Sequence, residues 1–259
     1  MIPTTLEPTG RTQADAHPTK NVREERTIPA CDLFLGPMSH ALRTPLNAII
    51  GFTGTLLMQL PGPLNDDQRE QLELVKTSAR QQLALINDLL DMVKIETGTY
   101  QINAAPDDVG AAINAAAASF QPLAVSKGLS FVVQIPDGET IVKSDHHALR
   151  RIITKLVSNA IRFTSQGGVR IDLRRENGAT EITVGDTGIG IATEDQPQLF
   201  VPFSRVGHDE ISYEEGTGVG LHLSQKLAGL LNACITVKSA PGHGSKFTLR
   251  LNDQVHGNS

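Results

Sequence analysis

The sequence has few of the features that mark exported or membrane-spanning proteins. Only two of its 259 residues are cysteines, which is too few for a disulfide framework. Its longest apolar stretches are interrupted by polar residues well before the roughly 18 residues that a membrane span requires. The N-terminus lacks the basic and then apolar pattern of a secretory signal. We therefore expect a cytoplasmic protein without a membrane span.

The sequence also has fewer basic than acidic residues. The chain carries 23 lysines and arginines against 28 aspartates and glutamates, which gives a formal net charge of −5. An acidic protein has no broad electrostatic attraction for polyanions, so we expect no nucleic acid among its partners. The length allows one large domain or two modest ones.

The first 98 residues divide into two parts. Residues 1–30 show scattered apolar positions and no periodicity, which predicts a disordered arm. Over residues 31–98 apolar residues recur at steps of three and four on either side of the turn Pro61-Gly62-Pro63. Asn65 and Gln68 resemble a capping box at the start of the second helix. These features predict an antiparallel helical hairpin. A lone hairpin leaves one side of its apolar seam uncovered, so we expect two copies to form a dimeric four-helix bundle.

Helical and strand-like patterns are mixed over residues 104–253. The predicted segments are helices at 109–125, 145–164 and 218–231, and strands at 130–135, 169–174, 181–185, 235–238 and 246–251. This order is typical of an α/β sandwich in which helices cover one face of a sheet. The predicted fold class is therefore α+β, with the hairpin followed by the sandwich.

The segment Ser39-His40-Ala41-Leu42-Arg43-Thr44-Pro45-Leu46 carries a candidate nucleophile. At about 100° per residue, His40 lies on the side of its helix opposite the apolar seam, and its imidazole is partly neutral near pH 7. The segment resembles the phosphoacceptor box of sensor histidine kinases, Ser-His-Glu-Leu-Arg-Thr-Pro-Leu. It departs from that box at Ala41, where the family has an acidic residue.

Three features of the later sequence suit a nucleotide. Lys155, Asn159 and Arg162 fall on one flank of a predicted helix. Asp186 directly follows a predicted strand, and its carboxylate can accept a hydrogen bond from the exocyclic amine of adenine. The glycine-rich segment from residue 216 opens a helix whose backbone N–H groups can hold phosphate.

Five segments of this region resemble the nucleotide-binding boxes of the same kinases, in the family's order. They are residues 158–164, 186–190, 200–203, 216–221 and 242–245. The resemblance implies a Bergerat-type ATP-binding fold, with a lid between the third and fourth boxes. It also implies that Asn159 ligates Mg²⁺, that Arg162 contacts phosphate and that Asp186 selects adenine. The other implied ATP-binding residues are Gly188, Gly190, Phe203, Gly216, Thr217, Gly218, Gly220 and Leu221. Lys155 is a second departure, because the family commonly has asparagine there; its ammonium either reaches the phosphates or is simply solvated.

The resemblance implies a homodimeric, ATP- and Mg²⁺-dependent histidine kinase. His40 would be autophosphorylated and the phosphoryl group passed to an aspartate on the receiver domain of a response regulator. A separate sensory protein is a further expected partner. Because Ala41 removes the expected base, two alternatives stay open: a phosphatase of the regulator, in which Thr44 orients water, and a nucleotide-gated dimer that docks regulators.

Overall fold

The computed structural model describes residues 30–138, 140–176, 178–204 and 218–252, with side chains described from residue 39 onward. The predicted N-terminal arm, apart from Ala30, lies outside the described residues. So do Gly216, Thr217 and nearly all of the expected lid.

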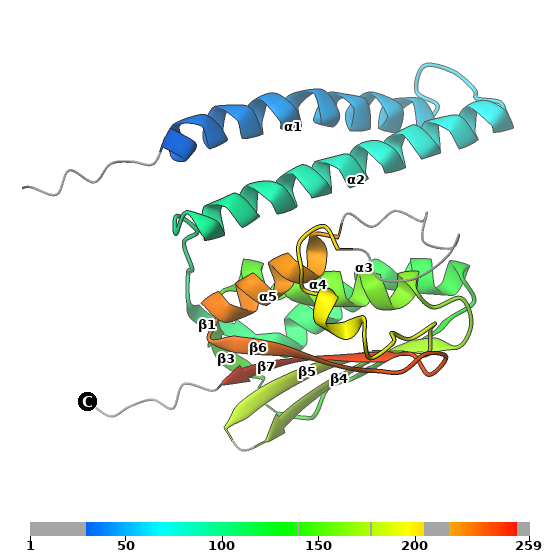
Figure 1. Ribbon diagram of the computed structural model, residues 1–259. Helices are drawn as coiled ribbons and strands as arrows, with labels where there is room; N and C mark the ends of the chain where they lie inside the picture. The colour runs from blue at the N-terminus through cyan, green and yellow to red at the C-terminus, as the bar shows by residue number, and fades with distance from the viewer. Residues whose placement is uncertain (1–29, 139, 177, 205–217, 253–259) are drawn as a thin grey trace, which may run out of the picture.

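Two long antiparallel helices form the first part of the chain, as the periodicity predicts (Figure 1). Helix α1 spans Ala30–Leu57 and α2 spans Asp66–Glu96. The predicted capping box is confirmed: the Asn65 side chain accepts a hydrogen bond from the Gln68 N–H at 2.8 Å, and the Gln68 side chain accepts one from the Asn65 N–H at 3.1 Å. The start of α2 is thereby fixed by local sequence.

The hairpin buries only part of its apolar surface within one chain. Leu46 and Leu90 are buried, whereas Ile49 and Phe52 are exposed, Phe52 with 73% of its surface accessible. Exposed apolar side chains on one helical face are costly in water and indicate a surface that another molecule covers.

A five-stranded sheet forms the second part of the chain. The strands are β2 (Ser130–Gln134), β4 (Gly168–Glu176), β5 (Ala179–Asp186), β6 (Ala233–Ser239) and β7 (Ser245–Asn252), in the order β2-β4-β5-β7-β6. Strands β2 and β4 are parallel, and the other neighbours are antiparallel. A separate antiparallel pair joins β1 (Ala105–Asp108) to β3 (Ile141–Ser144), which the sequence pattern did not predict.

Three helices lie between this sheet and the hairpin (Figure 1). They are α3 (Val109–Ser126), α4 (His146–Arg162) and α5 (Gly220–Leu230). A short 3₁₀ helix occupies Gln196–Gln198. The arrangement confirms the predicted α/β sandwich with helices on one face of the sheet.

Helix α4 runs through the middle of the core. Its apolar stripe, which includes Leu149, Ile152, Ile153 and Leu156, is at most 1% exposed and packs in one cluster with the sheet. Because this stripe fixes the rotation of α4, the polar residues on its flank are held at the edge of the core. The same sequence pattern that builds the core therefore positions the candidate site.

In the part of the chain that the structure describes, no helix is both long and apolar enough to cross a membrane.

Candidate active site

His40 lies on the exposed surface of α1. The Thr44 hydroxyl donates a hydrogen bond to the His40 carbonyl oxygen at 2.9 Å and lies 3.5 Å from the imidazole Nδ1. Arg43 donates from Nε to the Asn87 side-chain oxygen on α2 at 2.8 Å. The helix that carries the imidazole is thus tied to its partner helix, while the ring itself faces outward as the sequence predicts.

Asp186 lies at the end of β5, where it is half-buried. Its Oδ1 accepts hydrogen bonds from the Gly188 N–H at 2.8 Å and from the Ser245 N–H at 3.2 Å. Burial raises the pKa of the Asp186 carboxyl, and the two backbone donors only partly oppose that shift. Because Oδ1 is held by the backbone, Oδ2 is the oxygen available to a donor from a ligand.

The glycines around Asp186 let three backbone segments converge. A Cβ on Gly188 would overlap the Phe163 carbonyl, and one on Gly244, which has a φ of +73°, would overlap the Asp186 carbonyl. Gly190 likewise lies against the carbonyl of Ala240. In this structure the absence of side chains at these glycines therefore lets neighbouring backbone approach closely.

The start of α5 is joined to the third of the predicted boxes. The Phe203 N–H donates to the Gly218 carbonyl at 3.0 Å, and Gly218 has a φ of +67°, which favours glycine. Phe203 itself has a φ of +62°, a conformation that costs a non-glycine residue about 1–3 kcal/mol. Leu221, another predicted site residue, packs against the domain core. The structure thus brings Phe203 and Gly218 together.

Helix α4 connects the two ends of this site. Lys155 lies against Gly220 at the start of α5, and the carbonyl of Phe163 lies against Gly188 beside Asp186. Lys155 on α4 and Phe163, which directly follows α4, are eight residues apart, or about 12 Å along the helix axis. Asn159 lies midway between them, half-buried on the same flank. The Arg162 guanidinium is near this flank too, 5.5 Å from the centroid of the Phe163 ring.

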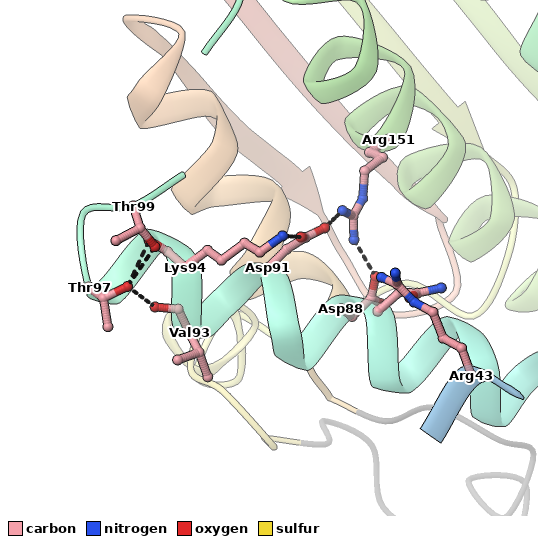
Figure 2. Close-up of polar contacts among 9 residues, drawn as sticks. Arg43, Asp88, Asp91, Val93, Lys94, Thr97, Thr99 and Arg151 are labelled. Carbon is pink, nitrogen blue, oxygen red and sulfur yellow. Dashed lines mark hydrogen bonds and ion pairs between the residues drawn. The ribbon is translucent and has the colours of Figure 1, made fainter. Parts of the chain in front are cut away.

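Local sequence patterns did not reveal a set of ion pairs between the hairpin and α4. Arg151 bridges two carboxylates of α2, those of Asp88 and Asp91 (Figure 2). Its Nη2 lies 2.8 Å from Asp88 Oδ1, and the Lys155 ammonium lies 2.8 Å from Asp88 Oδ2. In this structure the Lys155 ammonium is therefore paired with the hairpin.

The contact continues at the end of α2. Glu96 forms an exposed ion pair with Lys226 of α5 at 2.7 Å, and this pairing lowers the pKa of the Glu96 carboxyl. Ile95 packs against the core of the second domain. An acidic edge of α2 thus faces a basic edge of α4 and α5.

A cavity of about 450 Å³ lies beside these ion pairs. It is lined by Arg43, Asn47, Leu83, Ala84, Asn87, Asp88, Asp91 and Arg151. Six of its eight lining residues have charged or amide side chains, and the cavity lies between the hairpin and α4, so water can reach the charges at the contact.

Two protein families match the chain. Residues 32–98 match the His Kinase A (phospho-acceptor) domain, and residues 144–255 match the histidine kinase-, DNA gyrase B- and HSP90-like ATPase. The first match covers the hairpin with His40, and the second covers the segments that surround Asp186 and the start of α5.

Curated relatives and a solved structure agree with these matches. The chain is 37% identical to an uncharacterized sensor-like histidine kinase of Rhizobium meliloti, over 95% of the chain and 47% of the relative. It is 39% identical to the histidine protein kinase DivJ of Caulobacter vibrioides, over 84% of the chain and 36% of the relative. A crystal structure of full-length ShkA in complex with AMPPNP aligns with a TM-score of 0.68 at 25% identity, over 84% of this chain and 45% of that one. The chain thus spans between about a third and a half of the length of these curated relatives.

Proposed function

This chain belongs to the sensor histidine kinases, of which it carries the phospho-acceptor and ATPase domains, and we propose that it transfers the γ-phosphoryl group of ATP to His40. The observation that carries the proposal is the joining of two parts in one chain. One is a solvent-facing imidazole on a helical hairpin, and the other is a domain in which Asp186 and the start of α5 lie at opposite ends of a single helix flank.

The nucleotide would lie along the flank of α4. Asp186 Oδ2 would accept a hydrogen bond from the adenine amine, and the N–H groups at the start of α5 would hold the phosphates. Arg162 would add positive charge close to the same flank. Gly216 and Thr217, which are not among the described residues, would also contact the phosphates.

Asn159 suits Mg²⁺ because a side-chain amide supplies an oxygen ligand. Among the described residues, no group of three or more histidine, cysteine, aspartate and glutamate side chains could hold a metal ion. Mg²⁺ commonly takes only one or two protein ligands and completes its shell with water and substrate phosphates. A bound Mg²⁺ would supply charge neutralisation at the phosphates, and Asn159 would be its ligand in this chain.

The reaction requires a neutral imidazole with a lone pair on the attacking nitrogen. Nδ1 of His40 lies near Thr44, so Nε2 is the outward nitrogen and the nucleophile. A bond forms between Nε2 and the γ-phosphorus while the bond from phosphorus to the bridging oxygen breaks, and ADP leaves. The protein contributes positioning and charge stabilisation more than covalent chemistry. The phosphoryl group then passes to an aspartate on the receiver domain of a response regulator.

Incubation with γ-labelled ATP tests this function. We expect acid-labile label on the unmodified chain and none on His40→Ala, because alanine has no nitrogen to phosphorylate. His147→Ala is the control, since that exposed histidine lies in the first turn of α4, outside the segments that resemble the nucleotide-binding boxes. Label that persists on His40→Ala would show that the acceptor is wrong.

Homodimerisation follows from the exposed apolar face of the hairpin. Phe52→Glu would place a charge on the surface that the second copy covers, and we expect it to convert the dimer to monomer. Val125→Glu is the control, because Val125 is 65% exposed on α3, which belongs to the second domain. Light scattering measures both masses. A dimer of Phe52→Glu as stable as that of the unmodified chain would place the interface elsewhere.

Dephosphorylation of the regulator is a second candidate function. Ala41 supplies no acid or base beside His40, while the Thr44 hydroxyl lies on the same face of α1 and 3.5 Å from the ring. A hydroxyl at that position can orient a water molecule toward a phosphoryl group held near His40. This function would be favoured if the loss of phosphate from a regulator required Thr44 but did not require His40.

A further inference from the structure

Lys155 lies between the hairpin and the start of α5, where the phosphates of ATP are proposed to bind. Its ammonium lies 2.8 Å from Asp88 Oδ2 on α2. The same ammonium lies 2.9 Å from the position that a Cβ on Gly220 would occupy, so it is also beside the first residue of α5. One cation therefore borders two places where negative charge is held or expected.

Asp88 has two cationic partners, and they differ in how firmly they are held. Arg151 takes Oδ1 of Asp88 and also pairs with Asp91, so it is fixed at two points. The described structure pairs Lys155 with Asp88 alone, and lysine carries a single charge on a flexible stem. Of the two partners, Lys155 is the one that can leave.

Asp88 tolerates the departure of Lys155. The residue is 8% exposed, and a buried carboxylate without any partner would be strongly destabilising. Arg151 would remain on Oδ1, and the neighbouring cavity gives water access to the carboxylate. The exchange thus leaves no unpaired buried charge.

We propose that Lys155 is a positioning residue that exchanges Asp88 for the phosphates of bound ATP, so that nucleotide binding weakens the hold of the hairpin on the second domain. The proposal rests on the ATP site proposed above. For transfer to occur, the γ-phosphate bound by the second domain must reach His40. Lys155 would connect the binding of ATP to the release of α2. Because such coupling is reciprocal, weakening the ion pair between Asp88 and Lys155 must strengthen nucleotide binding.

Asp88→Asn tests the exchange, because asparagine keeps the shape and removes the charge that competes for Lys155. We expect the Kd for AMPPNP, measured by calorimetry on the full chain, to fall by at least about fivefold, the lower end of typical coupling. Asp91→Asn is the matched control: it removes a charge from the same edge of α2 but does not pair with Lys155 in the described structure, so its Kd should change less than twofold. In a Lys155→Met background, Asp88→Asn should no longer tighten binding.

A second measurement needs no change at Asp88. In the unmodified chain, AMPPNP should increase hydrogen exchange at the backbone amides of residues 84–92, and in Lys155→Met it should not. Three results would overturn the proposal that Lys155 exchanges Asp88 for phosphate. They are an unchanged AMPPNP affinity in Asp88→Asn, an equal gain in affinity from Asp88→Asn in the Lys155→Met background, and hydrogen exchange at residues 84–92 that AMPPNP does not alter. Failure of the unmodified chain to bind AMPPNP would overturn the proposed ATP site itself, which separates the two failures.

Discussion

Ala41→Glu is expected to raise the rate of phosphate incorporation at His40 by about 10²- to 10⁴-fold, the usual range for assistance by a general base. For Nε2 to attack, the proton on the other ring nitrogen must be taken up or held by a neighbouring group. Thr44 lies 3.5 Å from Nδ1, which is long for a hydrogen bond, and a neutral hydroxyl is too weak a base to take up that proton. A carboxylate at position 41 supplies the missing group. Position 41 is exposed in a helix, where glutamate is well tolerated.

Ala41→Gln is the matched control, because glutamine has the length of glutamate without its basicity. Initial rates of acid-labile labelling at saturating ATP measure the chemical step. The Kd for ATP should be the same in all three proteins, because position 41 lies on the hairpin and Asp186 on the other domain. If the unmodified chain labels rapidly and Ala41→Glu is no faster than Ala41→Gln, the missing-base account is wrong and another group serves as base.

The same experiment separates the kinase from the phosphatase. Negligible labelling of the unmodified chain, together with rapid loss of phosphate from a regulator, would favour dephosphorylation as the main activity. Thr44→Ala would then abolish that loss while leaving nucleotide affinity unchanged, because Thr44 lies on the hairpin and its hydroxyl bonds to His40 of the same helix.

Much of the fold could be predicted because the helices carry long, regular apolar patterns. The stripe from Leu149 to Ala160 predicted both the existence of α4 and the face that it buries, since a repeat of 3.6 residues places all of these apolar side chains on one face of a helix. Strands β1 and β3 escaped prediction because each has only four residues. Asp107 and Asp108 make β1 look like a loop, and its pairing with β3 depends on residues more than thirty positions away.

The candidate site divides in the same way. His40, Asp186 and the glycines lie in short contiguous motifs, so their roles could be predicted from local sequence. The pairing of Lys155 with Asp88 could not, because the two residues are 67 positions apart and each resembles an ordinary charged residue on a helix surface. A contact of this kind depends on how two domains pack. The pattern around Lys155 shows only that its flank of α4 is polar.

Asp186 offers the sharpest test of the nucleotide site. Its Oδ1 is held by the N–H groups of Gly188 and Ser245, which fixes the orientation of the carboxyl group. Asparagine at this position would keep its oxygen on these two donors, because they cannot be satisfied by an NH₂ group. The NH₂ group would then replace Oδ2 and face the adenine amine, so two donors would meet where the unmodified chain has a donor and a charged acceptor.

Asp186→Asn should therefore weaken ATP binding by about ten- to a hundredfold, the equivalent of losing a charge-assisted hydrogen bond of about 1.5–3 kcal/mol. The fold should survive, since both backbone hydrogen bonds are retained and the raised pKa of Asp186 shows that its charge is not favoured by the surroundings. Asp172→Asn is the control, because that aspartate pairs with Arg170 on β4 and lies away from the α4 flank. Calorimetry with ATP measures the Kd of each variant, and thermal unfolding verifies that each is folded. A folded Asp186→Asn that binds ATP as tightly as the unmodified chain would mean that adenine is recognised elsewhere.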